Sequence, residues 1–333
     1  MNLVTGAAGH LGNVLVRELL ARGEKVRVLL LPGEDTQSLA GLTVERVEGN
    51  VLEIDSLRAA MQNVDVVFHL AALVSITEDK SYLLQAVNVD GTRNVIEAAK
   101  GANVRQLIYT SSIHALERPP MGIPINEQLA FDPQNPAGPY DRTKAQASLL
   151  VQQATQDGLD TRILCPTGVL GPYDYRRSEV GELILSFMSN RVNVLIDGAF
   201  DFVDVRDVAQ GQILARDRGK TGETYILGGE RIELKLLHDL VQKVTGKDTS
   251  VITIPLPIAL IIAPMAELYY KLSKTKPRFT RYSLETVVSN TNIHSNKAKT
   301  ELGYQPRTLV SSVADTVRWW WDNLGFTKRS LRL

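Results

Sequence analysis

The sequence predicts an α/β fold in which a doubly wound parallel sheet is joined to a smaller, mostly helical C-terminal part. Short apolar runs alternate with helix-like segments through the first half of the 333-residue chain. These runs lack the regular alternation of half-exposed strands, as expected when helices cover both faces of a sheet. A glycine-rich turn opens the pattern, and a cluster of proline, glycine and charged residues at 171–181 interrupts it. The interruption marks where the smaller part begins.

The elements of the sheet follow in chain order. We expect strands at 3–4, 25–31, 43–47, 65–72, 105–109 and 161–164. We expect helices after the glycine turn and at about 54–61, 79–100 and 139–156, the last beginning with a proline, which the first helical turn tolerates. Two later runs, 202–208 and 223–227, are expected to return to the sheet. One domain would then comprise residues 1–166 plus about 201–228, and the other about 167–200 plus 229–333.

Composition excludes several classes of protein. The chain has 37 basic and 37 acidic residues, so nothing suggests attraction to nucleic acid. Its single cysteine, Cys165, excludes an internal disulfide framework and a cysteine-rich metal site. The five histidines show no metal-ligand spacing, and we expect no bound metal. The first strand begins at once, so we expect no signal peptide and a cytoplasmic location.

The most apolar segment is 251–270. It contains Pro255, Pro257 and Pro264 and then Glu267, and its continuous apolar run is shorter than a bilayer span requires. We therefore expect no transmembrane segment. The segment is interpreted as a buried or pocket-covering helix, and a helix lying at a lipid surface is the alternative.

The glycine turn is a candidate phosphate-binding loop. In the run Thr5-Gly-Ala-Ala-Gly-His-Leu-Gly12, Gly6 permits a tight turn, Gly9 admits a close pyrophosphate, and Gly12 lets the helix approach the strand. The unpaired N–H groups at the helix N-terminus favour an anion. The spacing differs from the usual Gly-x-Gly-x-x-Gly, and an ordinary strand-to-helix turn is the alternative. The flanking strand and helix favour a dinucleotide clamp.

Tyr140 and Lys144 are a candidate acid/base pair. Four residues apart on a predicted helix, their side chains share one face. A neighbouring ammonium favours the ionised phenol, so we expect Lys144 to lower the pKa of Tyr140 and suit it to general acid/base catalysis. The Tyr-x-x-x-Lys spacing is common by chance, so its weight as evidence depends on the residues that precede it in the chain.

Two serines precede the pair, in Tyr109-Thr-Ser-Ser-Ile113 at the carboxyl end of a predicted strand. Ligands of open α/β sheets bind at that edge. Ser112 is our choice for a hydrogen bond to the reacting substrate oxygen, and Ser111 would touch substrate or cofactor. Alternatively, one or both serines merely close the strand. Adjacent strand residues face opposite ways, so we do not expect both to do the same job.

Together these residues resemble the extended short-chain dehydrogenase/reductase family, within the NAD-dependent epimerase/dehydratase superfamily. The resemblance covers the first two-thirds of the chain in family order. Its motifs are the glycine turn, Phe68-His-Leu-Ala-Ala72, Asn88-Val-Asp-Gly-Thr92, Tyr109-Thr-Ser-Ser112, Tyr140-Asp-Arg-Thr-Lys144, Cys165-Pro-Thr-Gly-Val-Leu-Gly-Pro172 and Phe202-Val-Asp-Val-Arg-Asp-Val208. It implies a Rossmann-type fold with a substrate domain. It also implies that Tyr140 is the acid/base, Lys144 tunes it and holds the nicotinamide ribose, Ser112 orients the substrate, and Asn88 steadies the site.

The resemblance further implies a nicotinamide dinucleotide, NAD or NADP. The residues that would contact it are Gly6, Ala8, Gly9, His10, Leu11, Asn50, Val51, Leu70, Ala71, Ala72, Thr110, Ser111, Tyr140, Lys144, Pro166 and Thr167. Relatives select between the two cofactors after the second strand, with an acidic residue or an arginine. Here residues 29–32 contain neither, Glu34 and Asp35 come late, and Arg27 lies inside the strand. The missing arginine favours NAD.

Within the family, the sequence looks most like the 3-beta-hydroxysteroid dehydrogenase and dihydroflavonol reductase branch. That branch implies an NAD(P)-dependent oxidoreductase that interconverts a secondary alcohol and a carbonyl on a bulky, fairly apolar small-molecule substrate. One alternative is a nucleotide-sugar epimerase or dehydratase, whose diphosphate would need basic groups such as Arg176, Arg177, Arg191 and Arg281. Another is a non-catalytic dinucleotide-binding sensor or scaffold. The resemblance also implies a homodimer in which the helices near 80–100 and 139–156 pair.

Overall fold

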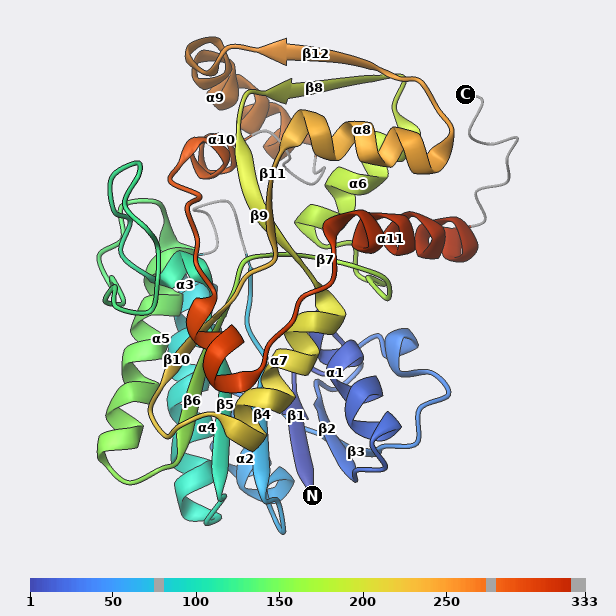
Figure 1. Cartoon of the computed structure of the whole chain (residues 1–333). Coiled ribbons are helices and arrows are strands. Elements are labelled where there is room, and N and C mark those ends of the chain that lie inside the picture. The colour runs from blue at the N-terminus through green and yellow to red at the C-terminus, as the bar shows by residue number, and fades with distance from the viewer. Residues whose placement is uncertain (75–80, 274–279, 325–333) are drawn as a thin grey trace.

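The central sheet has seven parallel strands in the order β10-β6-β5-β4-β1-β2-β3 (Figure 1). The structure, a computed structural model, describes residues 1–74, 81–273 and 280–324. The strands are β1 Asn2–Thr5, β2 Val26–Leu30, β3 Glu45–Glu48, β4 Val66–His69, β5 Gln106–Thr110, β6 Thr161–Pro166 and β10 Thr224–Leu227. All neighbours pair in parallel, which confirms the predicted doubly wound sheet.

Helices cover both faces of this sheet. One face packs against α1 (His10–Ala21) and α7 (Val205–Arg218), and the other against α2 (Ile54–Ala60), α4 (Gly91–Gly101) and α5 (Pro139–Gln156). Successive strand residues serve opposite cores: on β1, Leu3 packs on the α2, α4 and α5 side, and Val4 on the α1 and α7 side. Because both sides are apolar, the strands appear in the sequence as unbroken hydrophobic runs.

The helix expected over 79–100 contains an irregular turn. It begins as α3 (Ser81–Leu84), passes through a π-helical turn at Gln85–Asp90 and continues as α4. Its expected first two residues lie outside the described part of the chain. A π-helical turn inside a helix is often found at a functional site, and this one carries Asn88.

The second part of the molecule contains two small sheets, in the orders β11-β9-β7 and β12-β8. Their strands are β7 Gly168–Leu170, β8 Val192–Ile196, β9 Ala199–Asp204, β11 Glu230–Glu233 and β12 Ser250–Ile254. The helices are α6 Glu179–Ser189, α8 Leu234–Thr245, α9 Leu256–Ser273, α10 Arg281–Val288 and α11 Leu309–Leu324. These elements surround β9 above the central sheet in Figure 1.

One expected return to the central sheet is wrong. The run 202–208 does not join it, because β9 pairs with β7 and β11 and the chain becomes helical at Val205. The Asp204 side chain accepts a hydrogen bond from the backbone N–H of Arg206, which caps α7 and ends the strand. The return at 223–227 is confirmed, since β10 pairs with β6 at the sheet edge.

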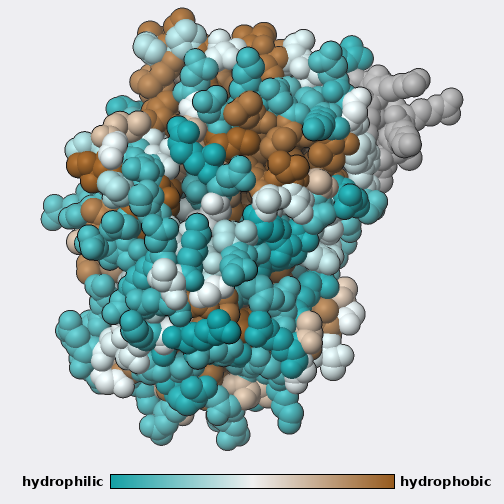
Figure 2. Space-filling model, viewed as in Figure 1, coloured by the Kyte–Doolittle hydropathy of each residue, from teal (hydrophilic) through white to brown (hydrophobic). Residues whose placement is uncertain are grey.

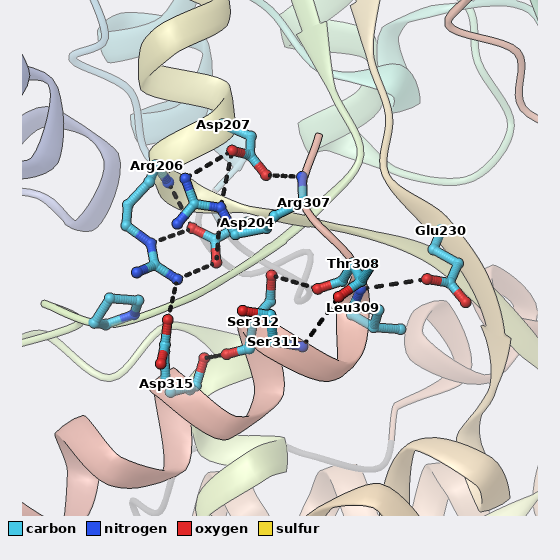
Figure 3. A network of polar contacts seen from close by, with 12 residues as sticks. Asp204, Arg206, Asp207, Glu230, Arg307, Thr308, Leu309, Ser311, Ser312 and Asp315 are labelled. Carbon is cyan, nitrogen blue, oxygen red and sulfur yellow. Dashed lines mark hydrogen bonds and ion pairs between the residues drawn. The ribbon is translucent and has the colours of Figure 1, made fainter. Parts of the chain in front are cut away.

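A network of charged side chains joins the two parts of the molecule (Figure 3). The Arg206 guanidinium donates to Asp204, where β9 meets α7, and to Asp315 on α11, the latter at 2.8 Å. Arg307 donates to Asp207 on α7 through its backbone N–H and its guanidinium. The network therefore fixes α11 and the segment before it to the N-terminal end of α7.

Of the two roles expected for the apolar segment 251–270, a buried helix is wrong for its described side chains, and a pocket-covering helix stays a prediction. Its start is β12, and α9 follows. Within 256–266, α9 packs through Ala259 and Ala263, while Ile261 and Met265 are exposed. Leu256 and Leu260 are partly buried beside these two alanines, so within 256–266 one face of α9 is packed while Ile258, Ile261, Ile262 and Met265 remain exposed. Figure 2 shows apolar residues gathered over α9 and β12. Among the described residues, no helix is long and apolar enough to cross a membrane.

Candidate active site

The candidate residues gather at the carboxyl edge of the central sheet. Because all seven strands are parallel, the segments that follow them lie along one edge. The glycine turn follows β1, Asn50 and Val51 follow β3, Leu70 to Ala72 follow β4, Ser111 and Ser112 follow β5, and Pro166 and Thr167 end β6 or follow it. Helix α5 brings Tyr140 and Lys144 to the same edge, where Lys144 contacts Thr110.

The glycine turn has the shape of an anion-binding loop. Gly6 has φ +70°, which favours glycine, and the Gly9 N–H donates to the Gly6 carbonyl at 3.1 Å. A Cβ on Gly12 would lie 2.1 Å from the Gly6 carbonyl oxygen, so only glycine allows α1 this close to β1. Gly9 is the N-cap of α1, whose first N–H groups point out of the helix end. The turn therefore fits a pyrophosphate.

Two of the expected cofactor contacts have side chains that bind elsewhere. The His10 ring nitrogen Nε2 lies 3.0 Å from the Pro172 carbonyl oxygen, and the Thr167 hydroxyl donates to Asp201 at 2.6 Å. Both contacts join the sheet edge to the second part of the molecule. A cofactor contact from His10 or Thr167 would therefore involve backbone atoms or require these side chains to move.

Ser112, Tyr140 and Lys144 form one connected site. The Lys144 Nζ donates to the Thr110 carbonyl oxygen at 2.6 Å and lies 4.7 Å from the centre of the Tyr109 ring. The Ser112 hydroxyl lies beside the Tyr140 phenol and acts to lower the pKa of that phenol. Tyr140 is partly exposed and Lys144 is buried. Tyr140 is thus the more accessible residue of the pair, while the Lys144 side chain is held against the end of β5.

The expected lowering of the Tyr140 pKa is wrong for the protein without ligand. Burial raises the pKa of Tyr140 to about 12, and the Ser112 hydroxyl offsets this only in part. Burial also lowers the pKa of Lys144 to about 7. A buried ammonium loses its hydration, so much of its charge is lost near neutral pH and it cannot strongly stabilise a phenolate. The spacing of Tyr140 and Lys144 could be predicted from the sequence, but their burial could not.

The two serines have different surroundings. The Ser111 and Ser148 hydroxyl oxygens lie 2.7 Å apart, so Ser111 faces α5. The Ser112 hydroxyl accepts from the His114 N–H at 3.2 Å and lies beside Tyr140. This arrangement agrees with the expectation that the two do not share one role. Ser112 is the serine that faces the phenol.

Asn88 holds the loop after β4 against α5. Its side-chain oxygen accepts from the Leu73 N–H at 2.8 Å, and its amide donates to the Leu73 carbonyl at 3.0 Å and to the Thr143 hydroxyl at 3.2 Å. Thr143 lies between Tyr140 and Lys144 on α5. The π-helical turn therefore places one buried amide where it links two sides of the site.

Another polar cluster lies behind Tyr140, and we did not predict it. Asp141 is fully buried, and Arg118 donates to it at 2.8 Å. The His114 ring is 6.4 Å from the Tyr140 ring and stacks on Phe200 at 5.7 Å, and Tyr282 of α10 lies 6.1 Å from it. The location of Asp141 directly after Tyr140 was a sequence signal that could have indicated its presence at the site. Phe200 and Tyr282 are distant in sequence, and only the tertiary fold brings them there.

His69 lies beneath the site with both ring nitrogens occupied. They are 2.8 Å from the Thr5 hydroxyl and 3.0 Å from the Thr92 hydroxyl, so the ring links β1, β4 and α4. Burial, with a smaller contribution from Lys144, lowers its pKa to about 3. His69 is therefore a neutral structural histidine under the loops that follow β1 and β4.

Glu34, which comes later than the position where relatives carry a cofactor selector, has a partner that we did not predict. Glu34, after β2, accepts from the Leu31 N–H at 3.0 Å and from the Arg176 guanidinium at 2.7 Å. Arg27 binds Glu45 and the carbonyls of Ala60 and Gln62, so it is occupied away from the carboxyl edge. A carboxylate and an arginine thus meet in the segment after β2, which in this fold class carries the residue that contacts the adenosine ribose.

The arginines considered for a sugar diphosphate pair with carboxylates on different elements. Arg176 pairs with Glu34 after β2, Arg177 lies 3.8 Å from Glu182 of α6, and Arg281 pairs with Glu285 within α10 at 2.7 Å. Arg191 is exposed just before β8. Three of the four guanidinium groups that could serve the epimerase alternative therefore already have a carboxylate partner.

The fold and site define a nicotinamide-dinucleotide-dependent enzyme of the short-chain dehydrogenase type. The model of the NAD dependent epimerase/dehydratase family matches residues 2–228. The chain belongs to this family, and it is an NAD(P)-dependent oxidoreductase. The resemblance inferred from the motifs is thereby confirmed.

Three similar proteins support this assignment over nearly the full length. Sterol demethylase protein B of Methylococcus capsulatus is 38% identical over 95% of this chain and 97% of its own. A putative dihydroflavonol 4-reductase of Synechocystis is 31% identical over 98% of this chain and 95% of its own. The crystal structure of gox2253, at 32% identity, superposes with a TM-score of 0.85 over 97% of this chain and 98% of its own.

Proposed function

We propose that the protein interconverts a secondary alcohol and a carbonyl on a bulky, fairly apolar substrate, with Tyr140 as the acid/base. The observation that carries this proposal is the contact of the Ser112 hydroxyl with the Tyr140 phenol, beside Lys144, at the carboxyl edge of the sheet. Each of the three has a distinct role. Tyr140 exchanges a proton with the substrate oxygen, Ser112 orients that oxygen, and Lys144 holds the nicotinamide ribose.

The chain's own residues supply positioning and proton transfer. The nicotinamide, when bound, accepts or supplies the hydride. The glycine turn would hold its pyrophosphate at the N-terminus of α1, and the segment Leu70 to Ala72 would lie along it. Asn50 and Val51 would contact the adenine end, and Pro166 the nicotinamide end. Asn88 keeps the loop after β4 in register with α5.

The surroundings of Tyr140 support an apolar substrate. Phe200, His114 and Tyr282 form an aromatic group next to the phenol. The similar proteins described as a sterol demethylase component and a dihydroflavonol reductase have names that refer to multi-ring compounds. Aromatic side chains beside the phenol favour ring systems over a sugar diphosphate, and the candidate arginines are largely paired. We therefore place a multi-ring alcohol or ketone ahead of a nucleotide sugar.

Substitution Tyr140→Phe tests the catalytic assignment. Removing the phenolic oxygen leaves the ring, so cofactor affinity measured by fluorescence titration should change little. Turnover of a multi-ring alcohol with NAD or NADP should fall by about 10²–10⁴-fold. Undiminished turnover would overturn the assignment. Bound cofactor that is never released in reduced form would favour the epimerase alternative, and cofactor binding without turnover of any substrate would favour a sensor.

We also propose a cytoplasmic homodimer and the two-domain division expected from the sequence. Exposed apolar side chains on α3 and α5, Tyr82 and Leu149, support pairing through these helices. Two observations support the two-domain division: the small sheets are separate from the central sheet, and β10 returns to the central sheet. Light scattering that gives the mass of one chain would refute the dimer.

A further inference from the structure

The segment that joins β7 to α6 lies against the first turns of α1 (Figure 1). The Pro172 carbonyl oxygen is 3.0 Å from Nε2 of His10, and the Tyr173 carbonyl oxygen accepts from the Asn13 amide at 3.1 Å. The Arg17 guanidinium lies 4.5 Å from the centre of the Tyr173 ring. Residues 10, 13 and 17 share one face of α1, because they are three and four positions apart. The segment is thus fixed beside the helix end that fits a pyrophosphate.

The other end of this segment reaches the turn after β2. The Arg176 guanidinium donates to the Glu34 carboxylate at 2.7 Å and to the Asp35 carbonyl oxygen at 3.1 Å. The second carboxylate oxygen of Glu34 accepts from the Leu31 N–H at 3.0 Å, so the turn itself holds Glu34 in place. In this fold class the residue after the second strand contacts the adenosine ribose. Residues 172–176 therefore run from the candidate pyrophosphate site to the segment that would contact this ribose.

Contacts on its other side give the segment a defined shape. The Tyr175 ring packs edge-on against Trp319 of α11, with the ring centres 5.2 Å apart. The Asp174 side chain accepts from the Ser178 hydroxyl at 2.7 Å and from the Ser178 N–H, which closes the turn before α6. Tyr173 has φ +69°, a conformation that residues other than glycine rarely adopt. Such a conformation persists only where the surroundings impose it, so both parts of the molecule shape this segment.

The two ends of the segment differ in how readily they open. At the α1 end, Asn13 is fully buried, and its amide also donates to the Gly9 and His10 carbonyls. At the β2 end, the Arg176 side chain is 45% exposed and that of Glu34 is 15% exposed. Water can solvate the charges of a partly exposed ion pair once it separates, whereas a buried amide would be left without a partner. The Arg176 end is therefore the end that opens.

We propose that residues 172–176 cover the adenosine half of the bound dinucleotide and that the Arg176–Glu34 ion pair is the latch of this cover. The end at Pro172 and Tyr173 stays fixed to α1 as the hinge, and the cofactor enters and leaves when the latch opens. Because the same opening precedes entry and exit, the latch changes both rate constants more than it changes the affinity. This inference concerns the cofactor alone and is independent of the reaction proposed at Tyr140.

Stopped-flow binding of NADH and of NADPH to the full-length protein tests the proposal. Energy transfer from tryptophan to the bound dihydronicotinamide reports association and dissociation without turnover. The test variant is Arg176→Ala, and Arg176→Lys keeps the positive charge. The matched control is Arg177→Ala, because the Arg177 side chain is similarly exposed (51% against 45%) but lies 3.8 Å from Glu182 of α6. Equal thermal unfolding midpoints show that the variants remain folded.

The measurement uses whichever dinucleotide the wild type binds more tightly. Arg176→Ala should raise the association and dissociation rate constants alike, by about fivefold, and leave Kd within about twofold of the wild type. Arg177→Ala should match the wild type, and Arg176→Lys should keep most of its slow exchange. High salt should accelerate exchange in the wild type but not in Arg176→Ala, because salt screens the ion pair.

Three results would overturn the proposal. The first is exchange in Arg176→Ala that is no faster than in the wild type or than in Arg177→Ala. The second is a rise in the dissociation rate constant alone, with Kd weakened by the same factor, because Arg176 would then bind the cofactor directly. The third is a wild type that binds neither dinucleotide. None of these readouts involves turnover, so they are distinct from a failure of the Tyr140 assignment.

Discussion

The Lys144 ammonium donates a 2.6 Å hydrogen bond to the carbonyl oxygen of Thr110, the last residue of β5. This bond fixes α5 to the strand that leads into Ser112. It also places an ionisable amine inside the protein, since Lys144 is only 3% exposed. Desolvating this lysine lowers the stability of the folded protein, and the size of that effect can be measured.

We expect Lys144→Met to stabilise the protein while abolishing turnover. The folded-state pKa is about 7, whereas an unfolded lysine titrates near 10.4. Between these values the unfolded state holds more protons, so the wild type should become more stable as the pH rises from 7 to 10. The methionine variant should lack this dependence and gain roughly 1–2 kcal/mol in the free energy of unfolding at pH 7.

Urea denaturation without cofactor at pH 7 and pH 9 measures both effects. Lys243→Met on the exposed side of α8 is the control, and its pH dependence should match that of the wild type. If the free energy of unfolding changes equally between pH 7 and pH 9 in the two methionine variants, Lys144 is charged throughout this range in the folded protein.

His69 should make the protein sensitive to acid. Its folded-state pKa is about 3 and the unfolded value is near 6.5, so the unfolded state takes up a proton between these values. Stability is therefore lost as the pH falls below 6.5, by about 2.5 kcal/mol between pH 7 and pH 4.5. His69→Gln should be less stable at pH 7, because Thr5 and Thr92 lose a well-placed partner, but should lose less on acidification.

Chemical denaturation at pH 7 and pH 4.5 measures how much unfolding free energy the wild type and His69→Gln each lose on acidification. His294→Gln, at a partly exposed position, should behave as the wild type does. A His69→Gln variant with the full acid sensitivity of the wild type would assign that sensitivity to other groups.

The network in Figure 3 should contribute strongly to stability. Burial raises the pKa of Asp204, but the hydrogen bonds and charge of Arg206 and the charge of Arg307 lower it more, so the carboxylate is favoured. Removing Arg206 leaves that carboxylate buried with fewer partners. We expect Arg206→Ala to lower the free energy of unfolding by about 3 kcal/mol. In the wild type, the stabilisation that the ionised Asp204 provides should be lost as the pH falls through the lowered pKa of Asp204.

Arg318→Ala is the matched control for Arg206→Ala. Arg318 also pairs with Asp315, at 2.9 Å, but its side chain is largely exposed. Its loss should cost about 0–1 kcal/mol. Thermal unfolding at pH 7 distinguishes the two variants, and equal losses would mean that the Arg206 contacts are no stronger than surface ion pairs.

The Glu34–Arg176 pair should set the cofactor preference. Glu34 would repel the 2′-phosphate of NADP, while Arg176 would bind it if released. Glu34→Gln should therefore raise kcat/KM with NADP relative to NAD by about tenfold, the effect of one charge-assisted hydrogen bond. Adding Arg176→Ala should reverse the gain. An unchanged ratio in Glu34→Gln would show that this pair does not face the ribose.

The sequence by itself determined the parallel sheet and the location of the site. Unbroken apolar runs separated by helices predicted strands buried on both faces, and β2, β5 and β6 confirm this. The glycine spacing predicted the turn after β1, because only glycine fits at Gly6 and Gly12. The spacing of Tyr140 and Lys144 predicted a shared helical face. These are local properties of the chain, and neighbouring residues are sufficient to specify them.

Tertiary structure decided the burial and the partners. The raised pKa of Tyr140 follows from what surrounds the phenol, and Arg176 reaches Glu34 across more than a hundred residues of sequence. The run at 202–208 has the composition of a sheet strand, yet β9 pairs with β7 and β11 instead. The exposed face of α9 likewise could not be predicted from its hydropathy. Hydrophobic character shows that a side chain favours burial, but only the packing shows whether the chain itself provides the cover.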